Sequence, residues 1–227
     1  SGVTIPRWGI GVIAGVGVLL VLLLIVLIPR GGSSSSASGG SGSSAGAEQQ
    51  LSRATSSVAA GSCGAGASDD DSVMDAAPKG TKWVTTDSGW IGPVSKTAGP
   101  IVDSPIRSCF EHSAEGALYA AVWAAIEINE APEAYMPTVV GPGADAARQN
   151  RKGDTKTRTV TRVAGYRYVS YTPERATVRL LFQIPSGAYR SWDVVMEWHD
   201  GDWRFWVPST LPQFSSADPD DFIAWGS

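Results

Sequence analysis

The chain has 227 residues and a formal net charge of −4, so it lacks the positive field on which nucleic-acid binding depends. The first 30 residues are mostly apolar. Roughly the next 40 are of low complexity, which leaves about 150 residues, enough for one folded domain of ordinary size.

Trp8 to Ile28 is an unbroken run of 21 apolar or glycine residues. As a helix it would be about 31 Å long, which matches the hydrocarbon core of a bilayer. We therefore predict a cytoplasmic stub over residues 1–7 and a transmembrane helix over residues 8–29. A cleaved signal peptide is the alternative, although its apolar region is usually shorter, about 7–15 residues.

Gly11 and Gly15 form a G-x-x-x-G spacing inside this apolar run. The spacing permits two membrane helices to approach closely and predicts self-association. The alternative is that glycine is simply common in membrane helices.

Residues 30–62 are rich in serine and glycine, which predicts a disordered tether because such a segment buries little apolar surface. The only two cysteines, Cys63 and Cys109, have no zinc-like spacing around them. We predict a disulfide between them if the compartment is oxidising. Such a disulfide would support an orientation with the N-terminus in the cytoplasm and the C-terminal part outside it. The alternative is that the two cysteines are unrelated thiols.

Residues 63–104 are expected to form an irregular lead-in that packs on a domain spanning residues 105–214. A helix is expected from near Ser108 to about Asn129, because Ser108 and Glu111 have capping-box spacing and apolar residues recur at helical intervals. Ser113 is a second candidate cap. Two short helices are predicted over residues 132–136 and 144–150.

The remaining pattern alternates with period two and predicts strands over residues 157–171, 176–184 and 192–198. Asp200-Gly201 is a strong hairpin turn signal and sets the register of the last strand. The predicted pairs are His199 with Asp202, Trp198 with Trp203, Glu197 with Arg204, Met196 with Phe205, and Val194 with Val207. The fold class is therefore α+β, with helices on one face of a curved antiparallel sheet of about four strands.

This order of elements resembles the nuclear transport factor 2-like fold. With the apolar run and the tether, it looks like the bitopic scaffold subunits of type IV secretion and conjugation systems. The stretch from Cys109 to Leu118 and the terminal Asp-Gly-Asp-Trp hairpin also look like those of uncharacterised membrane-tethered domains from conjugative elements of GC-rich Gram-positive bacteria. The resemblance covers about Cys63 to Pro208 and implies a non-enzymatic assembly protein that binds its neighbours in the envelope.

Enzymes that have the nuclear transport factor 2-like fold hold an acid or base inside a cone formed by the sheet and helices. Here the inner-face positions do not titrate, so we expect a packed core, no catalytic residue, no cofactor and no metal. These positions are Val178, Leu180, Phe182, Trp192, Val194, Met196, Trp198, Trp203 and Phe205. His112 is expected to neighbour the helix cap, His199 to be solvated beside the turn, and the acidic run 69–71 to be a solvated tether end.

The same register places Trp206, Val195 and Leu181 on the outer face of the sheet. Exposed together they would make an apolar stripe for self-association or for docking a partner. The alternative is that the lead-in around Trp83 and Trp90 covers them.

The function predicted from these features is a non-catalytic assembly subunit of a bacterial conjugation or type IV secretion apparatus. It would be a single-pass protein of the cell membrane that binds other subunits and possesses no nucleic-acid partner. The alternatives are a tethered ligand-binding or enzymatic domain with a cavity in the cone, and a cell-surface binding or regulatory module. The sequence leaves open whether the tail at residues 215–227 docks on the domain.

Overall fold

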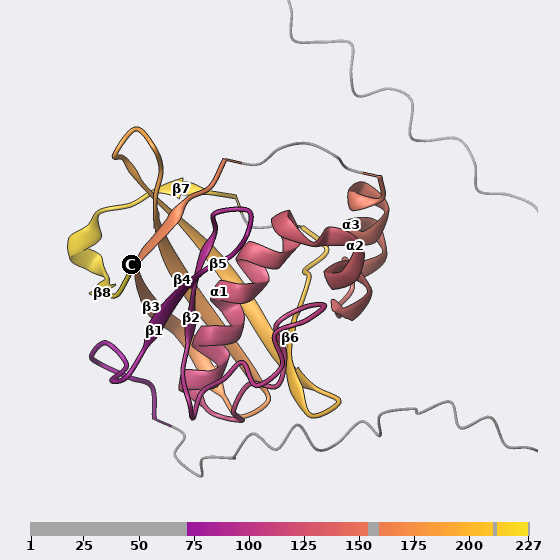
Figure 1. Ribbon diagram of the computed structural model, residues 1–227, viewed down its shortest axis with the longest axis horizontal. Helices are drawn as coiled ribbons and strands as arrows, with labels where there is room; N and C mark the ends of the chain where they lie inside the picture. The colour runs from indigo at the N-terminus through magenta and orange to yellow at the C-terminus, as the bar shows by residue number, and fades with distance from the viewer. Residues whose placement is uncertain (1–71, 154–158, 211–212, 227) are drawn as a thin grey trace, which may run out of the picture. The chain divides into compact units, whose positions relative to one another are not determined.

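The computed structural model describes residues 72–153, 159–210 and 213–226 (Figure 1). The predicted membrane helix with Gly11 and Gly15, the tether and Cys63 lie outside these residues. Within the described part of the chain, no helix is long and apolar enough to cross a membrane.

The described residues form an α+β domain, as predicted, with helices packed against a six-stranded antiparallel sheet and a separate two-stranded sheet. The elements are β1 (Lys82–Thr85), β2 (Ile91–Val94), α1 (Ala114–Glu130), α2 (Pro132–Tyr135), the 3-10 helix η1 (Met136–Thr138), α3 (Ala144–Arg151), β3 (Arg162–Thr172), β4 (Arg175–Gln183), β5 (Tyr189–His199), β6 (Asp202–Phe205), β7 (Ser215–Ser216), the 3-10 helix η2 (Pro219–Asp221) and β8 (Ile223–Ala224). The predicted short helices correspond to α2 with η1 and to α3.

The large sheet has the strand order β6-β5-β4-β3-β8, and β7 pairs with another part of β5. In Figure 1, α1 lies across one face of this sheet, and α2 and α3 follow beyond its C-terminal end. Buried side chains of α1, among them Leu118 and Trp123, belong to the same core as Leu180, Val194 and Met196 of the sheet. The alternating apolar positions therefore face the helix, as their period of two requires.

The predicted register of the last hairpin is confirmed for four of its five pairs, from His199 with Asp202 to Met196 with Phe205. Asp200 and Gly201 both have positive φ, 51° and 78°, as a two-residue turn of this kind demands. β6 ends at Phe205, so the fifth pair, Val194 with Val207, lies beyond the paired strand.

The predicted start of α1 at Ser108 is wrong, because the helix begins at Ala114 and is capped by Ser113. The Ser113 hydroxyl accepts a hydrogen bond from the Gly116 N–H at 3.0 Å. Ser108 instead forms an isolated antiparallel bridge with Val102, and Cys109 has a positive φ of 65°, which no helix contains.

The predicted irregular lead-in contains a hairpin, because β1 and β2 pair from Thr85 with Ile91 to Lys82 with Val94. Trp123 of α1 donates its indole N–H to the Pro93 carbonyl at 2.7 Å. A Cβ on Gly92 would lie 2.5 Å from the Trp123 ring, so this close approach requires glycine.

The C-terminal tail docks on the domain and raises the strand number from the predicted four to six. β8 pairs with β3 at one edge of the sheet. Trp225 is buried, with ring centroids 4.9 Å from Trp83 and 5.5 Å from Tyr119. Its indole N–H donates to the Thr81 hydroxyl at 3.1 Å, so the tail and the lead-in meet on the first half of α1.

Candidate functional site

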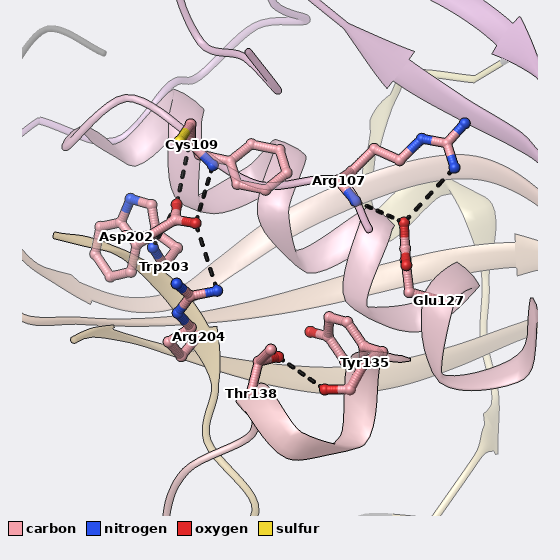
Figure 2. A network of polar contacts seen from close by, with 9 residues as sticks. Arg107, Cys109, Glu127, Tyr135, Thr138, Asp202, Trp203 and Arg204 are labelled. Atoms are coloured by element: carbon pink, nitrogen blue, oxygen red, sulfur yellow. Dashed lines mark hydrogen bonds and ion pairs between the residues drawn. The ribbon is translucent and has the colours of Figure 1, made fainter. Parts of the chain in front are cut away.

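Asp202 organises the segment that leads into α1 (Figure 2). Its carboxylate is only 1% exposed and accepts backbone N–H bonds from Cys109 at 2.9 Å and from Phe110 at 3.0 Å. It also accepts from the Trp203 N–H at 2.9 Å, and Arg204 lies 3.6 Å away. These donors compensate the buried charge, which would otherwise be costly. Asp202 therefore has a structural role.

Glu127 is the second deeply buried carboxylate, also 1% exposed. Its Oε1 accepts the Arg107 backbone N–H at 2.9 Å and lies 3.8 Å from the Arg107 guanidinium (Figure 2). Burial raises the pKa of Glu127, and the contacts with Arg107 oppose that rise. Its other oxygen is buried without a hydrogen-bond partner. Glu127 therefore connects Arg107 to α1, and it is not among the residues that line the cavity described below.

The two histidines have surface and packing roles. His112 stacks on Trp198 with centroids 3.9 Å apart, and its Nε2 lies 2.7 Å from the Pro173 carbonyl oxygen. His199 is exposed beside the turn, as expected, and its nearest carboxylate is that of Asp200 at 3.4 Å.

The buried tyrosines keep their protons over the physiological range. Burial raises the pKa of Tyr119 to about 12, and its hydroxyl lies 2.6 Å from the Thr81 hydroxyl. Burial also raises the pKa of Tyr135, Tyr166 and Tyr168 above the ordinary tyrosine value. Tyr168 donates to the Ala114 carbonyl at 2.5 Å, so these hydroxyls act as neutral structural groups.

The predicted interaction stripe is only partly exposed. Leu181 is 2% exposed, so the expectation that it contributes an exposed surface is wrong. It pairs with Gly165, beside which the backbone of the docked tail passes. Val195 and Trp206 are half-buried. The Arg175 guanidinium lies over the Trp206 ring at 4.6 Å. Of the lead-in residues expected to cover it, Trp83 packs on Trp225 and Trp90 lines the cavity described below.

Ion pairs surround this part of the outer face. Glu197 stands opposite Arg204 in the register, as predicted, but its salt bridge is with Arg175. Arg179 and Asp193 form a second, two-pronged pair with distances of 2.5 and 2.7 Å. The outer face near Trp206 is therefore apolar surface framed by paired charges.

A cavity of about 660 Å³ opens between the C-terminal end of α1, α3 and the ends of β4 and β5. The inner face was expected to be packed, and eight of its nine residues are buried, with Trp198 half-buried, but three of the buried ones also border this cavity. Phe182, Trp192 and Phe205 form one wall of the cavity. At the helical side of this cavity, α1 ends at Glu130 and the chain continues into α2 at Pro132.

The charged residues that line this cavity, within the described chain, are Arg151 and Arg190. Its polar residues are the amides and hydroxyls of Asn129, Asn150, Thr159, Thr161 and Gln213. General acid–base chemistry at neutral pH ordinarily uses a histidine, a carboxylate or a similarly titrating group within reach of the substrate. The lining is therefore suited to binding through apolar contact and positive charge.

Among the described residues, no group of three or more His, Cys, Asp or Glu side chains is arranged to hold a metal ion. Cys109 is buried next to Asp202, and its predicted partner Cys63 lies outside the described residues, so the pairing stays a prediction.

Sequence reasoning missed Asp202, Arg190 and the cavity. The Asp-Gly-Asp-Trp pattern identified the turn but carried no sign that its second aspartate bonds a backbone 92 and 93 residues earlier in the chain. Arg190 lies at the start of β5, where one arginine among alternating residues has no distinctive signature.

A family model described as Domain of unknown function (DUF8175) matches residues 44–222. No curated protein matches the chain. No solved structure matches it either.

Proposed function

We propose that this chain, which belongs to the DUF8175 family of domains of unknown function, is a non-catalytic assembly subunit of a bacterial cell-envelope machine of the conjugation or type IV secretion type. The folded domain would have the nuclear transport factor 2-like architecture and would bind neighbouring subunits outside the cytoplasm. The chain would cross the cell membrane once, with its N-terminus in the cytoplasm, and a disulfide between Cys63 and Cys109 would fasten the tether to the domain.

The observation that carries the proposal is the use of the buried acidic groups. Both carboxylates that are 1% exposed, Asp202 and Glu127, are engaged by backbone N–H groups and arginines, and neither lines the cavity. Because these buried carboxylates are hydrogen-bonded to the domain's own backbone, they stabilise the fold, and such a domain is suited to binding other subunits through its surface. The half-buried Trp206 and Val195, framed by ion pairs, are the proposed contact residues, because tryptophan in such a setting is typical of interface anchors.

Co-purification tests this proposal. The full-length tagged chain is extracted from its own host in mild detergent, and the proteins that accompany it are identified by mass spectrometry. Recovery of a transport ATPase together with channel subunits is the expected result. Recovery of the chain alone as a monomer would contradict it.

The second candidate function is a tethered ligand-binding domain, and the cavity of about 660 Å³ favours it. This volume lies within the range of about 300–1,000 Å³ that is usual for small-molecule sites. The lining combines an apolar wall with a few polar groups, as such sites usually do.

A further inference from the structure

We infer that the cavity binds an anionic single-chain amphiphile, such as a long-chain carboxylate, with its apolar chain inside and its head group beside Arg190. The inference rests on the second candidate function, binding within the cavity.

The interior of the cavity is suited to an apolar chain. Trp192 and Phe205 lie edge to face with centroids 5.7 Å apart and belong to its wall, with Phe182 beside them. Ile128 and Met136 supply aliphatic and thioether surface from the helical side. Burying apolar ligand surface against such walls is favourable by roughly 25 cal/mol per Å².

Arg190 supplies one of the two positive charges that line the cavity, the other being that of Arg151. Its side chain is half-buried, and the guanidinium donates one hydrogen bond at 2.8 Å to the Ser216 hydroxyl, a neutral acceptor. Within the described chain, Arg190 forms no salt bridge, in contrast to Arg175 and Arg179 on the same sheet. A guanidinium has five N–H donors in a planar fork, so an oxyanion has donors to engage.

Phe214 extends the apolar lining to the mouth of the cavity. It is 60% exposed, although its ring stacks on Trp192 at 5.5 Å and meets Phe182 edge to face at 6.0 Å. An exposed aromatic ring and a half-buried arginine in the same lining match a ligand that has an apolar chain and a charged head group.

The test uses the full chain in nanodiscs of phosphatidylcholine and a palmitate analogue with a photoreactive diazirine in its chain. A hexadecanol analogue with the same diazirine is the neutral comparison. Labelled peptides are mapped by mass spectrometry, with unlabelled palmitate as competitor. Arg190→Gln removes the proposed head-group contact, and Arg167→Gln, on the opposite face of the sheet, is the matched control. Ala147→Phe adds a ring to the cavity lining.

We expect the palmitate probe to label the peptides that carry Trp192 and Phe214. Labelling should fall about tenfold in Arg190→Gln and with the alcohol probe, because a charge-assisted hydrogen bond is lost. It should fall in Ala147→Phe and stay unchanged in Arg167→Gln. Cavity labelling that is equal for both probes, or undiminished in Arg190→Gln, would overturn the anionic class and leave cavity binding standing. Labelling confined to other peptides, or unaffected by Ala147→Phe, would overturn cavity binding itself.

Discussion

The backbone around Cys109 shows how one side chain fixes a distant segment. Cys109 has a φ of 65°, a conformation that costs a non-glycine residue about 1–2 kcal/mol. Asp202 stabilises it through the two N–H bonds from Cys109 and Phe110. The position of Cys109, and so the proposed attachment of the tether, depends on this carboxylate.

Asp202→Asn should therefore destabilise the fold by roughly 2–3 kcal/mol, because an amide nitrogen would face a backbone donor in a buried site. The free energy of unfolding is measured for the full chain by urea titration with circular dichroism. Asp200→Asn is the matched control, since Asp200 is an exposed turn residue and asparagine tolerates its positive φ. Equal stability of the two variants would contradict the role given to Asp202.

Glu127 predicts a dependence of stability on pH. Burial raises the pKa of Glu127 above the ordinary value of 4.5. In the pH range from 4.5 to this raised pKa, the folded state therefore binds more protons than the unfolded state. Stability should then fall as the pH rises from 4.5 through the pKa of Glu127 in the folded state. Burial also raises the pKa of Glu115, which acts in the same direction.

Glu127→Gln should flatten this decline, because the amide keeps an acceptor for the Arg107 N–H and loses the desolvated charge. Urea titrations between about pH 4.5 and 7 measure the slope. Glu133→Gln, at an exposed position, is the control. A slope in Glu127→Gln as steep as that of the unsubstituted chain would be incompatible with this account.

At the scale of elements, the sequence predicted what local chemistry determines. The Asp-Gly turn allows one register, so four hairpin pairs followed from it. The start of α1 did not follow, because Ser108 and Ser113 both have capping chemistry and the choice depends on Asp202, far along the chain. The two-residue strands β7 and β8 are too short to show a period and were not predicted.

The tail is an integral part of the fold, which Trp225→Ala tests. Trp225 is buried against Trp83, Tyr119 and Tyr166, so truncation should cost about 3–5 kcal/mol. Phe214→Ala removes an exposed aromatic ring directly before the tail and should cost about 1 kcal/mol. Urea unfolding measures both, and a similar small loss in each would mean that the tail is not integral.

At the scale of the molecule, the sequence predicted the α+β class and most of the inner-face residues, because a sheet with one buried face alternates with period two. It did not predict the cavity. That space arises where the end of α1, α3, β5 and Phe214 meet, and no single segment encodes it. Nor did it predict that Leu181 is buried, since the phase of a strand gives the direction of a side chain and not what covers it.

The central claim is that the folded domain, and not the apolar N-terminal segment, binds the neighbouring subunits. The most direct measurement compares the proteins that co-purify from the host with the tagged full chain, with Trp206→Ala, and with a chain ending after residue 71. We expect the subunits to be recovered with the full chain, reduced with Trp206→Ala and absent with the truncated chain. Equal recovery of the same partners with the truncated chain would contradict the claim.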